Sequence, residues 1–167
     1  MNALQVARCY ELHKMKLGEA LMLRSDNLRK VEELRVRAAA SAQIQEGTSP
    51  PDVASELIAE IERLLNETTK LIQRINRTNV TTRLPDGSVL ADALAQRDGY
   101  LSLRSALQGI AKAASEPQQR YMRSEIRVVR TIDTGAILKR ADELSRKHRL
   151  LDAEIQELNW TVDLKED

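Results

Sequence analysis

Residues 52–79, DVASELIAEIERLLNETTKLIQRINRTN, decide the fold. Within this stretch one set of positions recurs at alternating steps of four and three residues: Leu57, Ile61, Leu64, Thr68, Leu71 and Ile75. Such spacing predicts an α-helix with one apolar face. A second set repeats every seven residues beside the first: Ile58, Leu65 and Ile72. Together the two sets form a stripe that is too broad for a single partner helix, so we expect more than one neighbour.

A second regular seam lies close to the C-terminus. Its positions also step by four and three residues: Ile137, Ala141, Leu144, His148, Leu151, Ile155 and Leu158. This seam predicts another amphipathic helix, which Asp133 or Thr134 can cap. Less regular patterns predict two further helices, over residues 16–44 and 91–114. At 1.5 Å per residue these helices would be roughly 35–45 Å long, and antiparallel packing is the simplest way to bury their apolar faces.

Short strands are expected near the ends of the helices. In residues 81–89, TTRLPDGSV, the Pro-Asp pair suits a type I turn and Gly87 suits the left-handed conformation after it, which predicts a β-hairpin. Residues 124–132 and 160–164 alternate apolar and polar side chains as strands do. The predicted fold class is therefore mainly α: an elongated antiparallel four-helix bundle with a short β-hairpin and one or two further short strands.

The composition favours a helical domain and excludes several classes of protein. Of the 167 residues, 42% are hydrophobic but only 2% are aromatic, so Leu, Ile, Val and Ala must form the core. A typical β-sandwich or barrel relies on aromatic and β-branched strands and is excluded. The 26 basic and 25 acidic residues leave a net charge of +1, so we expect no specific nucleic-acid partner.

The sequence indicates a cytoplasmic protein. Cys9 is the lone cysteine, so an internal disulfide cannot form. No apolar run approaches the roughly 20 residues that a membrane-spanning helix needs, and the N-terminus lacks the pattern of a signal peptide. We therefore expect no stable insertion into a membrane.

Polar side chains near the expected hairpin could form a pocket: Asn76, Asn79, Arg97, Asp98 and Arg104. Arginine forks in such a cluster would suit a small anion or a nucleotide. The same side chains could instead satisfy backbone groups at helix ends, and one another, in a structural network. The sequence leaves both interpretations open and favours the structural one.

No catalytic, metal or cofactor site can be assigned. His148 occupies a seam position, but the nearest preceding acid, Glu143, does not fit the Glu-x-x-His spacing of di-iron bundles, so we predict a packed structural histidine. Residues 120–130 hold four arginines and one acid, and are expected to form a solvated or intersubunit face. No phosphate-binding loop or serine elbow is present, so an enzyme is not indicated.

Three further residues are expected to have structural roles. Gly87 should resist β-branched replacement if its φ is positive. Leu158 and Trp160 are expected to pack, with a buried indole, where the last helix meets the last strand.

Several strings resemble those of a known family: MKLGEALMLRSD at residues 15–26, QEGTSPPD in the first break, LIQRINRTN, LADALAQRD, RYMRSEIRVVRTI and the ending DAEIQELNWTVDL. Together they resemble the septicolysin-like family of small, largely uncharacterised bacterial proteins. The resemblance covers residues 15–167 and leaves out residues 1–14, so we expect an N-terminal leader and a single helical domain. It implies a helical, oligomer-forming cytoplasmic protein and supplies no catalytic residues.

Three functional hypotheses follow. The first is a non-enzymatic, self-assembling structural or interaction protein, a homo-oligomer, because the broad stripe in residues 52–79 needs more partners. The family name suggests a membrane-active, pore-forming oligomer, although the sequence has no tryptophan-rich insertion loop and no strand pair of membrane-spanning length. The third is a small-anion or nucleotide binder that uses the polar pocket.

Overall fold

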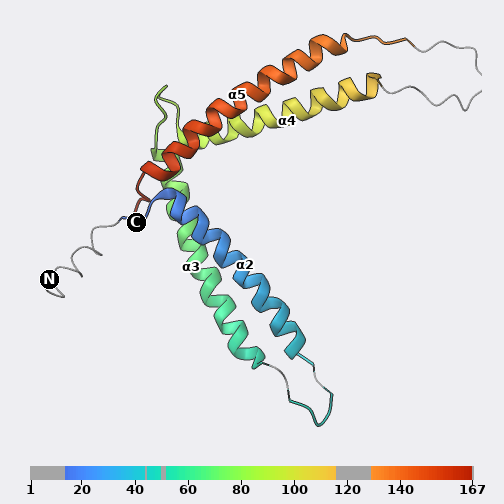
Figure 1. The fold of residues 1–167 in the computed structure, drawn as a ribbon. Coiled ribbons are helices and arrows are strands. Elements are labelled where there is room, and N and C mark those ends of the chain that lie inside the picture. The colour runs from blue at the N-terminus through green and yellow to red at the C-terminus, as the bar shows by residue number, and fades with distance from the viewer. Residues whose placement is uncertain (1–13, 44, 50–51, 116–128, 167) are drawn as a thin grey trace, which may run out of the picture. The chain divides into compact units, whose positions relative to one another are not determined.

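The computed structural model describes residues 14–43, 45–49, 52–115 and 129–166. In these ranges the chain forms four helices (Figure 1), which are α2 (Leu17–Ser41), α3 (Ala54–Thr81), α4 (Leu90–Ser115) and α5 (Thr134–Thr161). They correspond to the four helices expected from the sequence. The mainly helical class is therefore confirmed, and a helical bundle fits the described residues.

The chain divides into two compact units, each of which is described by itself. The first contains the described residues up to Arg83 and those from Gln156 onwards, and the second contains Leu84–Ile155. The first unit therefore holds α2, α3 and the last residues of α5, and the second holds α4 and the rest of α5. The single domain expected over residues 15–167 stays a prediction.

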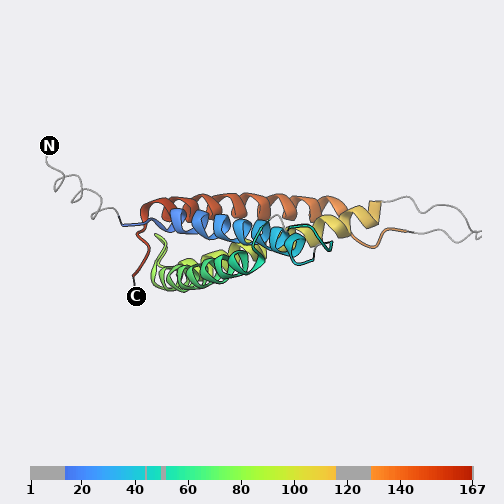
Figure 2. The ribbon, with the colours of Figure 1, turned by 90° about the horizontal axis from the view of Figure 1, so that it is seen from below.

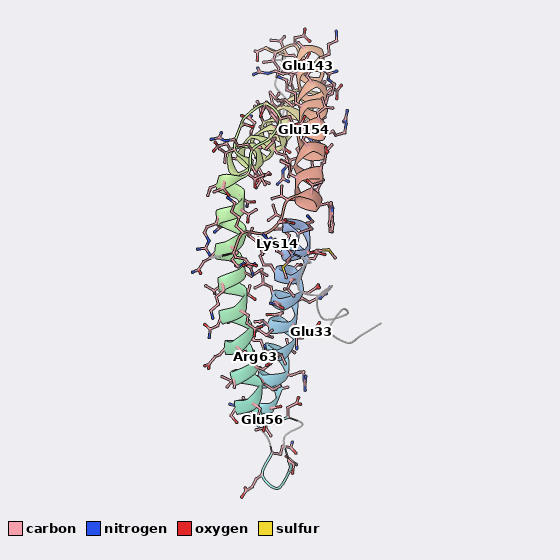
Figure 3. All side chains as sticks on the ribbon, turned by 90° about the vertical axis from the view of Figure 1, so that its left-hand side faces the viewer. Lys14, Glu33, Glu56, Arg63, Glu143 and Glu154 are labelled. Carbon is pink, nitrogen blue, oxygen red and sulfur yellow. The ribbon has the colours of Figure 1, made fainter. Side chains whose placement is uncertain are left out.

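In the first unit, α2 and α3 lie side by side (Figures 1 and 3). Lys30 pairs with Glu60 at 3.3 Å and Arg37 pairs with Asp52 at 2.6 Å, so residue numbers rise along α2 as they fall along α3. The two helices are therefore antiparallel. The buried residues of α3 are Leu64, Thr68, Leu71, Ile75 and Thr78. They continue the four-and-three spacing, so the predicted packing face of residues 52–79 is confirmed.

The C-terminal tail closes the end of this hairpin that lies opposite its loop. Two backbone hydrogen bonds of 2.8 and 3.0 Å join residues 15–17 to residues 162–164. On the α3 side, the N–H of Lys165 donates to the hydroxyl of Thr78 at 3.0 Å. The Nε of Arg74 donates to the carbonyl oxygen of Lys165 at 3.1 Å. The tail thus ties the start of α2 to the end of α3.

The strand predicted at residues 160–164 is wrong. α5 continues as a helix through Thr161, and the tail beyond it forms an isolated antiparallel bridge between Asp163 and Lys16. No longer ladder can develop there because the opposing segment enters α2 at once. Residues 129–132 are not in a strand either, and residues 124–128 lie outside the described residues.

The turn expected at Gly87 forms, but the strands of the predicted hairpin do not. The N–H of Gly87 donates to the carbonyl oxygen of Leu84 at 2.9 Å. The N–H of Leu84 donates to the carbonyl oxygen of Ser88, also at 2.9 Å. Gly87 has φ +86°, in the left-handed region that favours glycine, as predicted. The β-hairpin prediction is wrong because α3 runs on to Thr81 and α4 begins at Leu90, which leaves little chain for strands.

In the second unit, α4 lies beside α5 (Figures 1 and 2). The carboxylate of Asp133 accepts the N–H of Ala136 at 3.0 Å, which confirms Asp133 as a cap of α5. Three of the buried apolar residues of this unit are alanines, and the full set is Leu84, Leu90, Ala93, Ala111, Ala141, Leu144 and Ile155. The buried seam of the two helices therefore combines large and small apolar side chains.

Candidate functional site

The residues of the predicted polar pocket are divided between the two units. Asn76 and Asn79 lie on α3 in the first unit, where Asn76 is exposed and Asn79 is half-buried. Arg97, Asp98 and Arg104 lie on α4 in the second unit. Because each unit is described by itself, a pocket shared by all five residues stays a prediction.

Within the second unit, Arg97 is held by two carboxylates. Its Nη2 lies 2.8 Å from Oδ1 of Asp98, and its Nη1 lies 3.2 Å from Oδ1 of Asp152 on α5. These ion pairs engage the guanidinium nitrogens that a bound anion would need. The arrangement matches the structural-network interpretation. Arg104 lies further along α4, and its Nε is buried without a hydrogen-bond partner among the described residues.

The three residues predicted to pack along α5 differ in burial. His148 and Leu158 are half-buried, whereas Trp160 is 54% exposed, so the expectation of a buried indole is wrong. The indole instead covers Gly18 of α2. A Cβ atom at Gly18 would lie 3.1 Å from Cε3 of Trp160 and 3.0 Å from the carbonyl oxygen of Asn159. Gly18 therefore permits this close approach, which sequence reasoning missed because a glycine in a helical pattern does not reveal what covers it.

A cleft of about 480 Å³ lies in the second unit, beside the start of α4. Its lining is mixed in character: Asp86, Ser88, Asp92, Ala93, Gln96, Tyr100, Lys147, Leu150, Leu151 and Glu154. Hydrogen bonds from the hydroxyl and the N–H of Ser88 lower the pKa of Asp86. The five residues of the predicted pocket do not line this cleft. Nowhere in the described ranges do three or more His, Cys, Asp or Glu side chains gather where they could hold a metal ion.

An apolar strip runs beside the seam of the first unit. On α3, Ile58 and Leu65 are 50% and 42% exposed, and Ile72 is half-buried. On α2, Leu28 is 45% exposed, and Leu21, seven residues earlier, is half-buried. We call these five residues the apolar flank.

The two halves of the apolar flank lie on the same side of the hairpin. An α-helix turns about 100° per residue, so Leu28 points about 160° away from Lys30, and Ile58 points about 160° away from Glu60. Lys30 and Glu60 form an ion pair across the seam, so the apolar positions turn together to the opposite side. The antiparallel register also brings Leu28 within about one turn of the level of Leu65. The Lys30–Glu60 ion pair and the apolar flank therefore lie on opposite sides of this hairpin.

The charged side of the hairpin predicts a pH dependence of stability. A hydrogen bond from Arg63, supported by Lys30, lowers the pKa of Glu60 from 4.5 to about 2. Because the pKa is lower in the folded chain than in the unfolded one, ionised Glu60 stabilises the fold above about pH 4.5. This contribution is lost as the pH falls toward 2.

Glu60→Gln should therefore flatten the dependence of the melting temperature on pH between about 4.5 and 2, measured by circular dichroism. Glu62→Gln is the matched control, because it removes a carboxylate for which the described chain provides no ion pair. This control should keep the slope of the parent protein. A parent-like slope in Glu60→Gln would contradict the prediction.

Comparisons with known proteins agree with this fold. A crystal structure of a functionally unknown conserved protein from Corynebacterium diphtheriae is similar, with 39% sequence identity and a TM-score of 0.85. The alignment covers 92% of this chain and 100% of that chain. No curated protein matches the sequence.

Among the described helices, none is both long enough and apolar enough to cross a membrane.

The resemblance to the septicolysin-like family stays a prediction. A profile of a family of unknown function, DUF6847, matches residues 24–164. Because this match covers most of the sequence, the chain belongs to the DUF6847 family, whose function is unknown.

Proposed function

We propose that the protein is a non-enzymatic structural or interaction protein that assembles with copies of itself. The observation that carries the proposal is the number of large apolar side chains exposed on both units. On α2 and α3 they include Met22, Leu28, Val36, Ile58 and Leu65. On α4 and α5 they include Leu101, Leu103, Ile110, Leu138 and Leu150. Exposed apolar surface of this kind is typical of sites where proteins associate.

The second unit supports the proposal because it buries several small residues while large apolar ones stay exposed. Ala93, Ala111 and Ala141 are buried, and the ion-paired Arg97 is only 24% exposed, whereas Leu101 and Leu103 are 40% and 41% exposed. Burial of an apolar side chain is worth about 1.5–3 kcal/mol, so leaving Leu101 and Leu103 partly exposed forgoes part of this gain. Packing against another chain would supply the missing burial.

The other two hypotheses have less support. Because two carboxylates already engage Arg97, the small-anion or nucleotide hypothesis lacks its main binding group. A membrane-active oligomer would release dye from liposomes at low protein concentration, and inert behaviour with several lipid compositions would remove that alternative. A cytoplasmic location is part of the proposal, because the lone Cys9 cannot form an internal disulfide.

Native mass tests the proposal directly. Light scattering over a hundredfold range of protein concentration should give a discrete multiple of the 18.8 kDa chain mass at the upper end. A mass of 18.8 kDa over the whole range would overturn self-assembly.

A further inference from the structure

We infer that the apolar flank, Leu21, Leu28, Ile58, Leu65 and Ile72, is the surface on which a second copy of this chain docks, so that two α2–α3 hairpins form a four-helix bundle. The inference rests on the proposed function and adds the surface and the occupant. Four-helix bundles commonly pair antiparallel hairpins through such seams.

The first argument is the position of the ion pairs relative to the apolar flank. The ion pairs of Glu60 with Lys30 and Arg63 lie on the opposite side of the seam from the apolar flank. Docking on the flank therefore leaves these ion pairs in water, which limits the desolvation cost. Along α2 the seven-residue repeat ends at Arg35, whose Nε donates to Glu32 at 2.8 Å. Such a polar pair is typical of the rim of an interface.

The second argument concerns the identity of the occupant. The flank is two helices wide and shows the same seven-residue repeat on both, so an identical hairpin presents a matching surface. Two-fold association uses the same patch on both subunits, which requires this kind of self-complementarity. The net charge of the chain is only +1, so two copies do not repel each other strongly.

The third argument concerns the size of the contact. From Ile58 to Ile72 the strip is about 21 Å long, and two adjacent helices are about 20 Å wide, which gives roughly 400 Å² of flat area per copy. This area is smaller than the roughly 800 Å² per partner of a standard stable interface. We therefore expect a dimer that dissociates on dilution.

The test replaces the two exposed leucines of the flank with lysine. Leu28→Lys/Leu65→Lys should have the mass of a single chain at concentrations where the parent is dimeric, because burying unpaired charges should weaken association at least about 100-fold. The matched control on α2 is Leu23→Lys. This side chain is 41% exposed and points about 140° away from Leu28, so this variant should dimerise like the parent.

Rescue by opposite charge separates docking from misfolding. Leu28→Glu/Leu65→Glu, mixed with the lysine variant, should restore a mixed dimer, and both variants should retain the helical circular dichroism of the parent. If the parent assembles and the lysine variant assembles equally well, the flank is not the docking surface, and the proposed function stands. A melting temperature lowered by the lysines without any change in mass would show that the flank is covered within one chain, and would also overturn the inference. A parent that stays monomeric would overturn both.

Discussion

Replacing Leu17 with alanine is expected to lower the free energy of unfolding by about 2–5 kcal/mol. Leu17 is the first residue of α2, its exposed fraction is 0%, and its N–H donates to the carbonyl of Val162 in the tail at 3.0 Å. Loss of the side chain beyond Cβ would leave a cavity where the tail meets α2. Denaturant unfolding followed by circular dichroism, at one fixed protein concentration, measures the change.

Leu23→Ala is the matched control for this prediction. Leu23 lies on the same helix, and the same atoms are removed, but the side chain is 41% exposed. We expect this variant to stay within about 0.5 kcal/mol of the parent. Similar losses from Leu17→Ala and Leu23→Ala would contradict the view that the start of α2 is the anchor of the first unit.

Replacing Thr78 with valine is expected to destabilise the fold by about 1–3 kcal/mol. Thr78 has an exposed fraction of 0%, and its hydroxyl donates to the carbonyl of Arg74 at 2.9 Å and accepts the N–H of Lys165 at 3.0 Å. Valine has nearly the same shape but no acceptor, so the N–H of Lys165 would lose its partner. Thermal and denaturant unfolding should both show the loss.

The same substitution ten residues earlier on α3 should have the opposite sign. Thr68 is 2% exposed, and its hydroxyl has no hydrogen-bond partner among the described residues. Thr68→Val removes a buried polar atom that pays a desolvation penalty, so we expect a gain of about 1 kcal/mol. If Thr68→Val and Thr78→Val both destabilise by a similar amount, the hydroxyl of Thr78 does not hold the tail.

The helices could be predicted from the sequence because their information is local. The four-and-three spacing from Leu57 to Ile75 indicates the packing face of α3, and the positions of Asp133 and Thr134 indicate a cap at the start of α5. The pattern at residues 160–164 misled the prediction because a short alternating segment fits a helix end as well as a strand. The tail pairs with residues 15–17, and no local pattern reveals a contact at such a separation.

At the polar cluster and at the apolar flank, too, contacts between distant parts of the sequence could not be predicted. Arg97 and Asp98 are neighbours in sequence and were identified together, but Asp152, which completes the ion-pair cluster, lies on another helix. On α3 the repeat of Ile58 and Leu65 is visible in the sequence. Its continuation onto Leu28 of α2 requires the antiparallel register, which the ion pairs across the seam show.

The position of Trp160 gives the chain an internal optical probe. It is the one tryptophan in the sequence, and its indole covers Gly18 while about half of it faces water. Release of the last turn of α5 from α2 would hydrate the ring fully and shift its fluorescence emission to longer wavelength. Emission would therefore follow undocking of this end of α5, while circular dichroism follows all the helices, and the two signals would show whether it detaches before the helices melt.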